Sequence, residues 1–206
     1  INPDSSLNYY TIKTGGLKGG HSGIDIKEPR GNANILVGRT LQGIQQICPI
    51  YLVQFQGGSA HNAIPRDSYA VFAADQNSFT QIQDTVKNFE NIFKKEFPLE
   101  TNLTLSISPN QEKPQQVLDI PSTKKTIDIT LAIPHGVFSM SQEDPELVET
   151  SNNFAKIKIE NDYLEVLTSQ RSSLMSKRDW LTYQIESIGF LAGGEVKSSN
   201  GYPSWE

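Results

Sequence analysis

The sequence predicts an α+β fold in which two ferredoxin-like βα units share one antiparallel sheet, with helices on one face of it. The first half of the chain alternates strand and helix patterns, and much of that order returns after a polar, proline-bearing connection at residues 109–121. Apolar residues also repeat at helical spacing in segments that lie between predicted strands. Two such halves side by side would give one sheet of about seven or eight strands.

The first predicted strand covers residues 9–14, and a helix follows from about Asn32, whose side chain is an acceptable N-cap. The apolar face of this helix is formed by Val37, Leu41 and Ile44. Residues 50–56 and 68–75 are rich in tyrosine, valine and phenylalanine, which predicts two further strands.

The clearest element is the next helix, because four apolar residues in it are spaced by four, three and four positions. They are Ile82, Val86, Phe89 and Phe93. Leucine and isoleucine then alternate with polar residues over 103–107, which is typical of a strand buried on one side. The first half therefore follows the order βαββαβ.

The second half is expected to begin with a helix from near Ser122 that ends before Pro134. Strands follow at residues 149–159 and 163–170. A last helix is predicted by an apolar stripe formed by Leu174, Leu181, Ile185 and Ile188.

Two glycines at positions 193 and 194 would end that helix, before a final strand at residues 195–199. The second half therefore follows the order αββαβ. We assign residues 1–206 to one domain with sub-units at about 8–110 and 120–202.

Composition excludes several classes of function. The net charge of -5 gives no support to nucleic-acid binding. No apolar stretch approaches the roughly 20 residues that a membrane span needs. The single cysteine, Cys48, allows no internal disulfide and is expected to be a small buried residue in a cytoplasmic protein.

The most informative stretch is the glycine-rich segment 14–26, which carries His21 between the first strand and the first helix. Glycines let a backbone turn sharply and approach a ligand closely, so such a loop suits a functional group. The three histidines lie 40 and 74 residues apart, and none stands in a metal-ligand pattern. We therefore expect this chain to bind no catalytic metal by itself.

Four motifs resemble those of the aminoacyl-histidine dipeptidases, the bacterial peptidase D group. GLKGGHSGIDI at 16–26 with RGNAN at 30–34 is the first, and GGSAHNAIPR at 57–66 resembles that family's GG…NAIPR turn. LAIPHGV at 131–137 with SMS at 139–141 is similar to LPHGV…MS. GYPSW at 201–205 is similar to GYPGW, and all four stand in the family's order.

The resemblance implies a dinuclear zinc dipeptidase that hydrolyses Xaa-His dipeptides such as carnosine. In that family two sequence pieces form the catalytic domain with its zinc ligands, and a lid and dimerisation domain is inserted between them. Every matched motif belongs to the lid, so the chain is expected to be an excised lid that is inactive alone. Its implied partners are its own catalytic domain, a second identical subunit and a dipeptide substrate, without nucleic acid or membrane.

The resemblance also implies site residues. His21 is expected to reach the neighbouring subunit's active site and donate a hydrogen bond to the scissile carbonyl as it gains negative charge. Asn62 either contacts substrate or caps its own proline-bearing turn. Arg171 is a candidate for binding a substrate carboxylate.

Three other residues are not assigned to the site. His61 stands where relatives often have arginine, and Lys27 stands where they often have histidine. His135 is expected to close a helix end.

A second class of function stays open on the residues alone, namely a non-catalytic α+β protein-interaction module. Only the dipeptidase interpretation requires catalytic segments on both sides of this chain, so the full open reading frame distinguishes the two.

Overall fold

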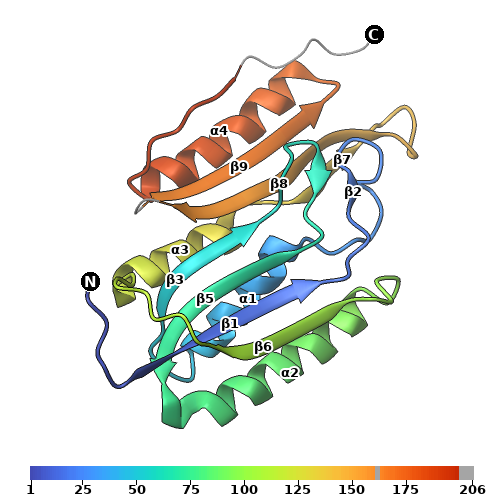
Figure 1. Cartoon of the computed structure of the whole chain (residues 1–206). Coiled ribbons are helices and arrows are strands. Elements are labelled where there is room, and N and C mark those ends of the chain that lie inside the picture. Colours follow the sequence, from blue (N-terminus) through green and yellow to red (C-terminus); the bar gives the residue numbers. More distant parts are fainter. Residues whose placement is uncertain (161–162, 200–206) are drawn as a thin grey trace.

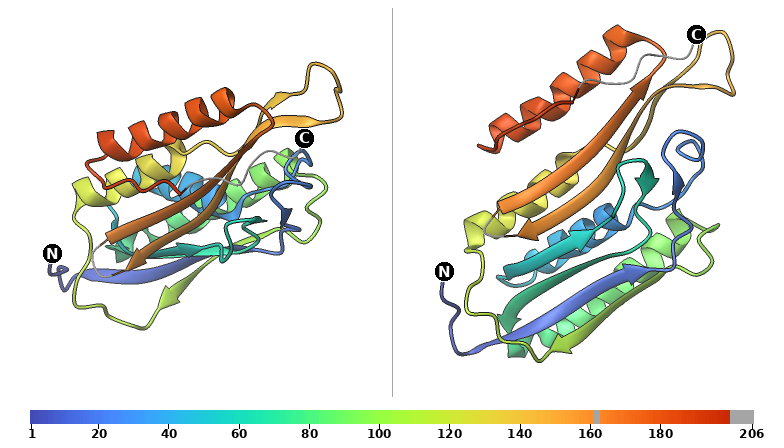
Figure 2. Two further views of the ribbon diagram at one scale, coloured as in Figure 1. Left: turned by 90° about the horizontal axis from the view of Figure 1, so that it is seen from above. Right: turned by 45° about the horizontal axis from the view of Figure 1, so that its top comes forward.

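A computed structural model describes residues 1–160 and 163–199 (Figure 1). It contains a seven-stranded antiparallel sheet with helices on one face, which confirms the predicted fold class (Figure 2). The strands of this sheet are β1 (Leu7–Gly15), β3 (Tyr51–Gly57), β5 (Ser68–Asp75), β6 (Thr104–Asn110), β7 (Gly136–Met140), β8 (Val148–Glu160) and β9 (Tyr163–Ser172). The helices are α1 (Ala33–Gln45), α2 (Phe79–Glu96), α3 (Ile120–Ala132) and α4 (Met175–Leu191).

The sheet has the order β6-β1-β5-β3-β8-β7, and β9 also pairs with β8. Strand β9 pairs along almost the whole of β8, so β3 and β7 share the other side of that strand. A second, two-stranded sheet joins β2 (Gly20–His21) to β4 (Ala63–Ile64). This small sheet is what fixes the position of the glycine-rich segment.

Helix α1 forms where the sequence predicts it. Asn32 caps it, accepting a hydrogen bond from the Asn34 amide at 3.0 Å. The Asn32 side chain also donates to the Phe154 carbonyl at 2.9 Å, so the cap ties α1 to β8. The predicted apolar face of α1 is fully buried under the sheet.

The two halves of the chain join through both layers. In the sheet, Gly57 of β3 pairs with Ile157 of β8. Beneath it, α1 packs on α3, and a Cβ atom at Gly38 would lie 2.6 Å from the Thr130 Cγ2 atom, so the glycine permits this close approach. The side of β3 that faces away from β5 is therefore occupied by the second half of the same chain.

Parts of the fold differ from the prediction. Residues 195–199 form no strand; Val196 lies against Gly189 and the Ser198 hydroxyl donates to Glu186, so this segment returns along α4 instead of joining the sheet. Strands β2, β4 and β7 were not predicted. The GYPSW motif at 201–205 lies outside the described residues.

The division into sub-units at about 8–110 and 120–202 stays a prediction. Within the part of the chain that the structure describes, no helix has the length and hydropathy of a membrane span.

Candidate functional site

His21 lies in β2, on the glycine-rich connection between β1 and α1 (Figure 1). Its Nδ1 atom accepts a hydrogen bond from the Gly23 amide at 3.2 Å. A neutral imidazole that accepts at Nδ1 carries its proton on Nε2, and that N–H is then left to donate to a ligand. The residue is partly exposed.

The turn that carries His21 is fastened by a carboxylate. Asp25 accepts a hydrogen bond from the His21 amide at 2.8 Å and pairs with the Arg30 guanidinium at 3.0 Å. Arg30 donates in addition to the Gly19 carbonyl at 2.5 Å. Residues 19–30 therefore form a closed loop whose ends are held together, which limits the motion of His21.

The segment that carries Asn62 lies directly beside His21. The Ser22 amide donates to the Asn62 carbonyl at 2.8 Å, and His21 pairs with Ala63 in the small sheet. Asn153 of β8 supports this segment from below, because its amide nitrogen donates to the carbonyls of His61 and Ala63 at 3.1 Å and 2.8 Å.

The side chain of Asn62 makes none of the hydrogen bonds found among the described residues, and it is partly exposed. The structure therefore shows no self-capping bond at Asn62, which was one of its two expected roles.

Arg171 reaches the same place from the far end of β9. A Cβ atom at Gly23 would lie 3.1 Å from the Arg171 Nη1 atom and 3.2 Å from the His21 Cε1 atom. The guanidinium and the imidazole thus flank the same glycine, and any larger residue there would press on both. The structure brings together all three residues that the sequence suggested, from three segments far apart in the chain.

This arrangement has a definite chemistry. The imidazole and the guanidinium lie beside Gly23, and the Asn62 backbone is bonded to the same turn. None of the three side chains is part of an ion pair among the described residues. Guanidinium groups bind carboxylates through paired hydrogen bonds, and a neutral imidazole N–H stabilises a developing oxyanion. This site is therefore suited to an anionic ligand that has a carbonyl group.

The remaining candidates lie apart from this chemistry. His61 is exposed, and Lys27 donates to the Glu146 carbonyl at 3.0 Å. His135 follows α3 and is largely buried; its Nδ1 atom accepts from the Phe154 amide at 3.3 Å. Burial lowers the pKa of His135 to about 4, because it disfavours the charged imidazolium. His135 also lines a cavity of about 280 Å³ with Arg30 and Arg39.

No group of three or more metal-ligating side chains occurs within residues 1–160 and 163–199. His135 uses one ring nitrogen on backbone, and His21 uses one on the Gly23 amide. These described side chains do not fit a dinuclear zinc centre. None of the roles proposed for residues of this chain therefore depends on a metal ion bound by them.

Two supporting residues were missed at the level of sequence. Gly23 leaves space for Arg171 beside His21, and Asn153 holds the Asn62 segment. Gly23 stands inside the motif but carries no side chain that would indicate a role. Asn153 lies in a strand where only the tertiary fold shows what its amide meets.

Comparisons with known proteins identify relatives of this domain. Residues 12–101 match the family model described as Peptidase dimerisation domain. The cytosol non-specific dipeptidase of Escherichia coli (strain K12) is 32% identical over 192 residues, which are 93% of this chain and 39% of that protein. The crystal structure of aminoacylhistidine dipeptidase from Vibrio alginolyticus superposes with a TM-score of 0.95 at 33% identity.

That superposition covers 100% of this chain and 42% of the Vibrio chain. The chain thus spans about two fifths of the length of each relative. The similarity extends through both halves of the sheet, well beyond the residues that the family model matches. We conclude that residues 12–101 of this chain form a peptidase dimerisation domain, and that the chain as a whole is similar to the corresponding part of both dipeptidases.

Proposed function

We propose that the chain is the lid and dimerisation part of a dinuclear zinc dipeptidase that hydrolyses Xaa-His dipeptides such as carnosine. The observation that carries the proposal is the meeting of His21, Asn62 and Arg171 at one edge of the domain. The similarity to two dipeptidases over 93% and 100% of the chain supports it. The two zinc ions would be held by catalytic segments outside these residues, in a cytoplasmic enzyme.

Each residue has a distinct role in this proposal. His21 donates its Nε2 hydrogen to the scissile carbonyl oxygen as that atom gains negative charge in the transition state. Arg171 binds the carboxylate at the end of the dipeptide, and Asn62 hydrogen-bonds the substrate backbone. The lid thereby supplies orientation and charge stabilisation.

Substrate-binding variants of the intact enzyme test these roles. Arg171→Ala is expected to raise KM for dipeptides by roughly 10- to 100-fold, because a charged hydrogen-bonded pair is lost. The same change should matter far less for a dipeptide amide, which has no terminal carboxylate. Asn62→Ala should raise KM for both substrates. Equal KM values for wild type and Arg171→Ala would refute the assigned role.

The choice of substrate is tested separately. The Vibrio relative is an aminoacylhistidine dipeptidase, and the Escherichia coli relative is a non-specific dipeptidase. We expect carnosine to be hydrolysed, with a higher kcat/KM than a matched dipeptide that lacks histidine. The reverse order would contradict the Xaa-His preference.

A mixing experiment tests whether His21 acts on the neighbouring subunit. His21→Ala subunits are combined with subunits whose zinc site is defective. In a heterodimer one active site then has an intact metal centre and a wild-type lid histidine from the other chain, so activity should return. Heterodimers that form without any gain in activity would place His21 in the active site of its own chain.

A further inference from the structure

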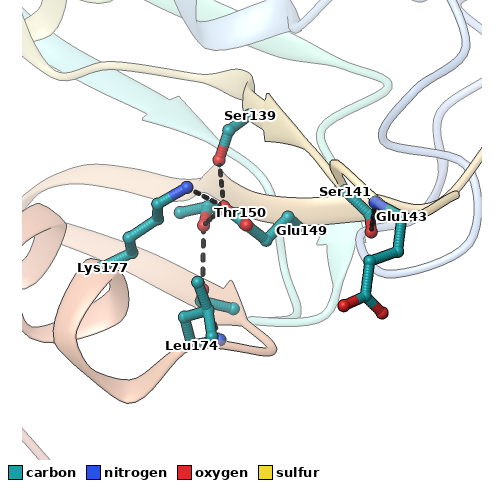
Figure 3. Close-up of polar contacts among 8 residues, drawn as sticks. Ser139, Ser141, Glu143, Glu149, Thr150, Leu174 and Lys177 are labelled. Carbon is teal, nitrogen blue, oxygen red and sulfur yellow. Dashed lines mark hydrogen bonds and ion pairs between the residues drawn. The ribbon is translucent and has the colours of Figure 1, made fainter. Parts of the chain in front are cut away.

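Glu149 is a buried carboxylate that joins three elements at the end of β9 (Figure 3). The residue is 7% exposed, near the start of β8. Its Oε1 atom accepts hydrogen bonds from the Ser139 hydroxyl of β7 at 2.7 Å and from the Thr150 hydroxyl at 3.3 Å. The Lys177 ammonium of α4 also donates to it.

A carboxylate in this setting is a firm anchor. Burying a charge costs free energy unless it is paired and hydrogen-bonded, so Glu149 and Lys177 hold each other in place. The hydrogen bond from Lys177, followed by the one from Ser139, lowers the pKa of Glu149. The carboxylate is therefore ionised at neutral pH and links β7, β8 and α4 together.

The residues that immediately follow Arg171 are held by Thr150, whose hydroxyl is bonded to the Glu149 carboxylate, and by the backbone of Glu149. The hydroxyls of Thr150 and Ser172 are hydrogen-bonded at 2.8 Å, and the Ser173 amide donates to the Glu149 carbonyl at 3.0 Å. The Leu174 amide then donates to the Ser172 hydroxyl at 3.1 Å, which begins α4. These bonds fix the backbone of residues 172–174 between Arg171 and helix α4.

The residue before Arg171 is fixed as well. The Gln170 side chain donates to the Asn152 carboxamide at 2.8 Å, while Arg171 itself pairs with Ser151. Among the residues that the structure describes, the Arg171 guanidinium takes part in no hydrogen bond or ion pair, and it lies against Gly23. The backbone on both sides of Arg171 is thus fixed by hydrogen bonds, whereas its guanidinium can bind a ligand.

We propose that Glu149 is a positioning residue for Arg171, and that it sets how tightly the lid holds the carboxylate end of a dipeptide. This inference rests on the substrate-binding role proposed above for Arg171. Glu149 touches no substrate. It acts through Thr150, Ser172 and Lys177, which hold the end of β9 where the guanidinium can meet both the ligand and His21.

The central test is Glu149→Gln in the intact enzyme, a change that keeps the shape of the side chain and removes its charge. We expect KM for carnosine to rise roughly tenfold, the scale of one charge-assisted hydrogen bond, with kcat within about twofold of wild type. KM for carnosine amide should change little. Lys177→Arg should retain the wild-type KM, whereas Lys177→Met should raise it as Glu149→Gln does.

A matched control separates positioning from general stability. Glu90 on α2 is 8% exposed and is held by Lys87 and Lys94, each at 2.7 Å, so it is a similarly buried carboxylate that is also paired with lysine. Glu90→Gln is expected to leave KM unchanged. A KM increase equal to that of Glu149→Gln would overturn the proposal.

A double-variant cycle separates the positioning role of Glu149 from the substrate-binding role of Arg171. In the Arg171→Ala background, Glu149→Gln should have no further effect on KM, because its only route to the substrate has been removed. Full additivity, or a normal KM for Glu149→Gln beside a raised KM for Arg171→Ala, would overturn the positioning role alone. A normal KM for Arg171→Ala would overturn both roles.

Ser172→Ala supplies a second variant if Glu149→Gln does not fold. It removes the hydrogen bond between Thr150 and the end of β9 without leaving a buried charge unpaired. KM for carnosine should again rise, and amide hydrogen exchange should accelerate at residues 172–174. Unchanged KM and unchanged exchange in this variant would contradict the proposal.

Discussion

At the scale of single residues, His135 is a titratable group that is held by a backbone hydrogen bond and by burial. The sequence placed it at a helix end. It lies just after α3 and beside a cavity, with its Nδ1 atom engaged by backbone. The charged groups that line the same cavity are Glu28, Arg30 and Arg39, and each arginine is already paired with a carboxylate. His135 is therefore neutral in the folded state.

His135 makes the stability of the fold depend on pH. Its pKa falls from 6.5 to about 4 on folding, so its contribution is complete above pH 6.5 and is lost as the pH drops toward 4. Urea unfolding at pH 7 and pH 4.5 should show a loss of roughly 1–3 kcal/mol that His135→Gln lacks. Carboxylates titrate identically in both proteins, so equal pH dependence in wild type and variant would refute this origin.

Cys48 behaves as the small core residue that the sequence suggested. It is 8% exposed, and burial raises the pKa of its thiol. A neutral, covered thiol reacts slowly. We expect a disulfide reagent at pH 8 to modify the native chain at least about tenfold more slowly than the chain in urea. Equal rates would show that the thiol is open to solvent.

At the scale of elements, the site depends on how strongly β8 holds the small β2–β4 sheet. Asn153 makes two hydrogen bonds to carbonyls of that segment, and its own oxygen is buried with no partner among residues 1–160 and 163–199. Within the same residues, the Ser22 hydroxyl next to His21 is also buried without a partner. The segment that carries Asn62 is thus held to β8 mainly by the side-chain amide of Asn153.

Asn153→Ala should loosen this layer. Two buried carbonyls lose their donor, which typically costs about 1–3 kcal/mol. Amide hydrogen exchange should accelerate at residues 61–64 and at His21, while α2 keeps its wild-type protection. Gln54→Ala, at an exposed position on β3, is the control. If exchange at residues 61–64 is unchanged, the support comes from another residue.

The strongly periodic elements were predictable because one buried face dictates their pattern. Ile82, Val86 and Phe93 of α2 are buried as their spacing requires. Strands β2 and β4 have two residues each and exist only because they pair across the fold, so no local pattern indicates them. Residues 195–199 were expected to form a strand after the glycines that end α4, but they lie along α4, where Val196 contacts Gly189.

The candidate site was predictable in part for the same reason. The glycine-rich motif pointed to His21, resemblance supplied the roles of His21 and Asn62, and Arg171 was suggested by its place after a predicted strand. Their meeting point, and the gap at Gly23 that permits it, depends on the pairing of β8 with β9 and of β2 with β4. Such long-range pairings leave no trace in local spacing.

At the scale of the whole molecule, one hydrophobic core runs through both halves of the chain. Ile12 and Phe72 of the first half belong to the same buried cluster as Ile127 and Phe154 of the second. We expect calorimetry to show a single cooperative transition. Two separable transitions would instead support independent sub-units at about 8–110 and 120–202.

The whole chain is also expected to lack the catalytic machinery. We predict no dipeptidase activity on carnosine with added zinc or manganese, and no stoichiometric zinc by elemental analysis, because the described histidines and carboxylates form no ligand cluster. Robust turnover by these 206 residues alone would overturn the assignment as a lid.

We propose that His21 stabilises the transition state of dipeptide hydrolysis, and the turnover number of the intact enzyme is the direct measure of that role. His61 provides a control, because it is an exposed histidine whose segment lies beside the partly exposed His21. His21→Ala should fold and bind zinc normally, yet lower kcat by roughly 100- to 1000-fold, the loss expected for one oxyanion donor. His61→Ala should keep kcat near wild type. Near wild-type kcat in His21→Ala, or an equal loss in both variants, would contradict the account.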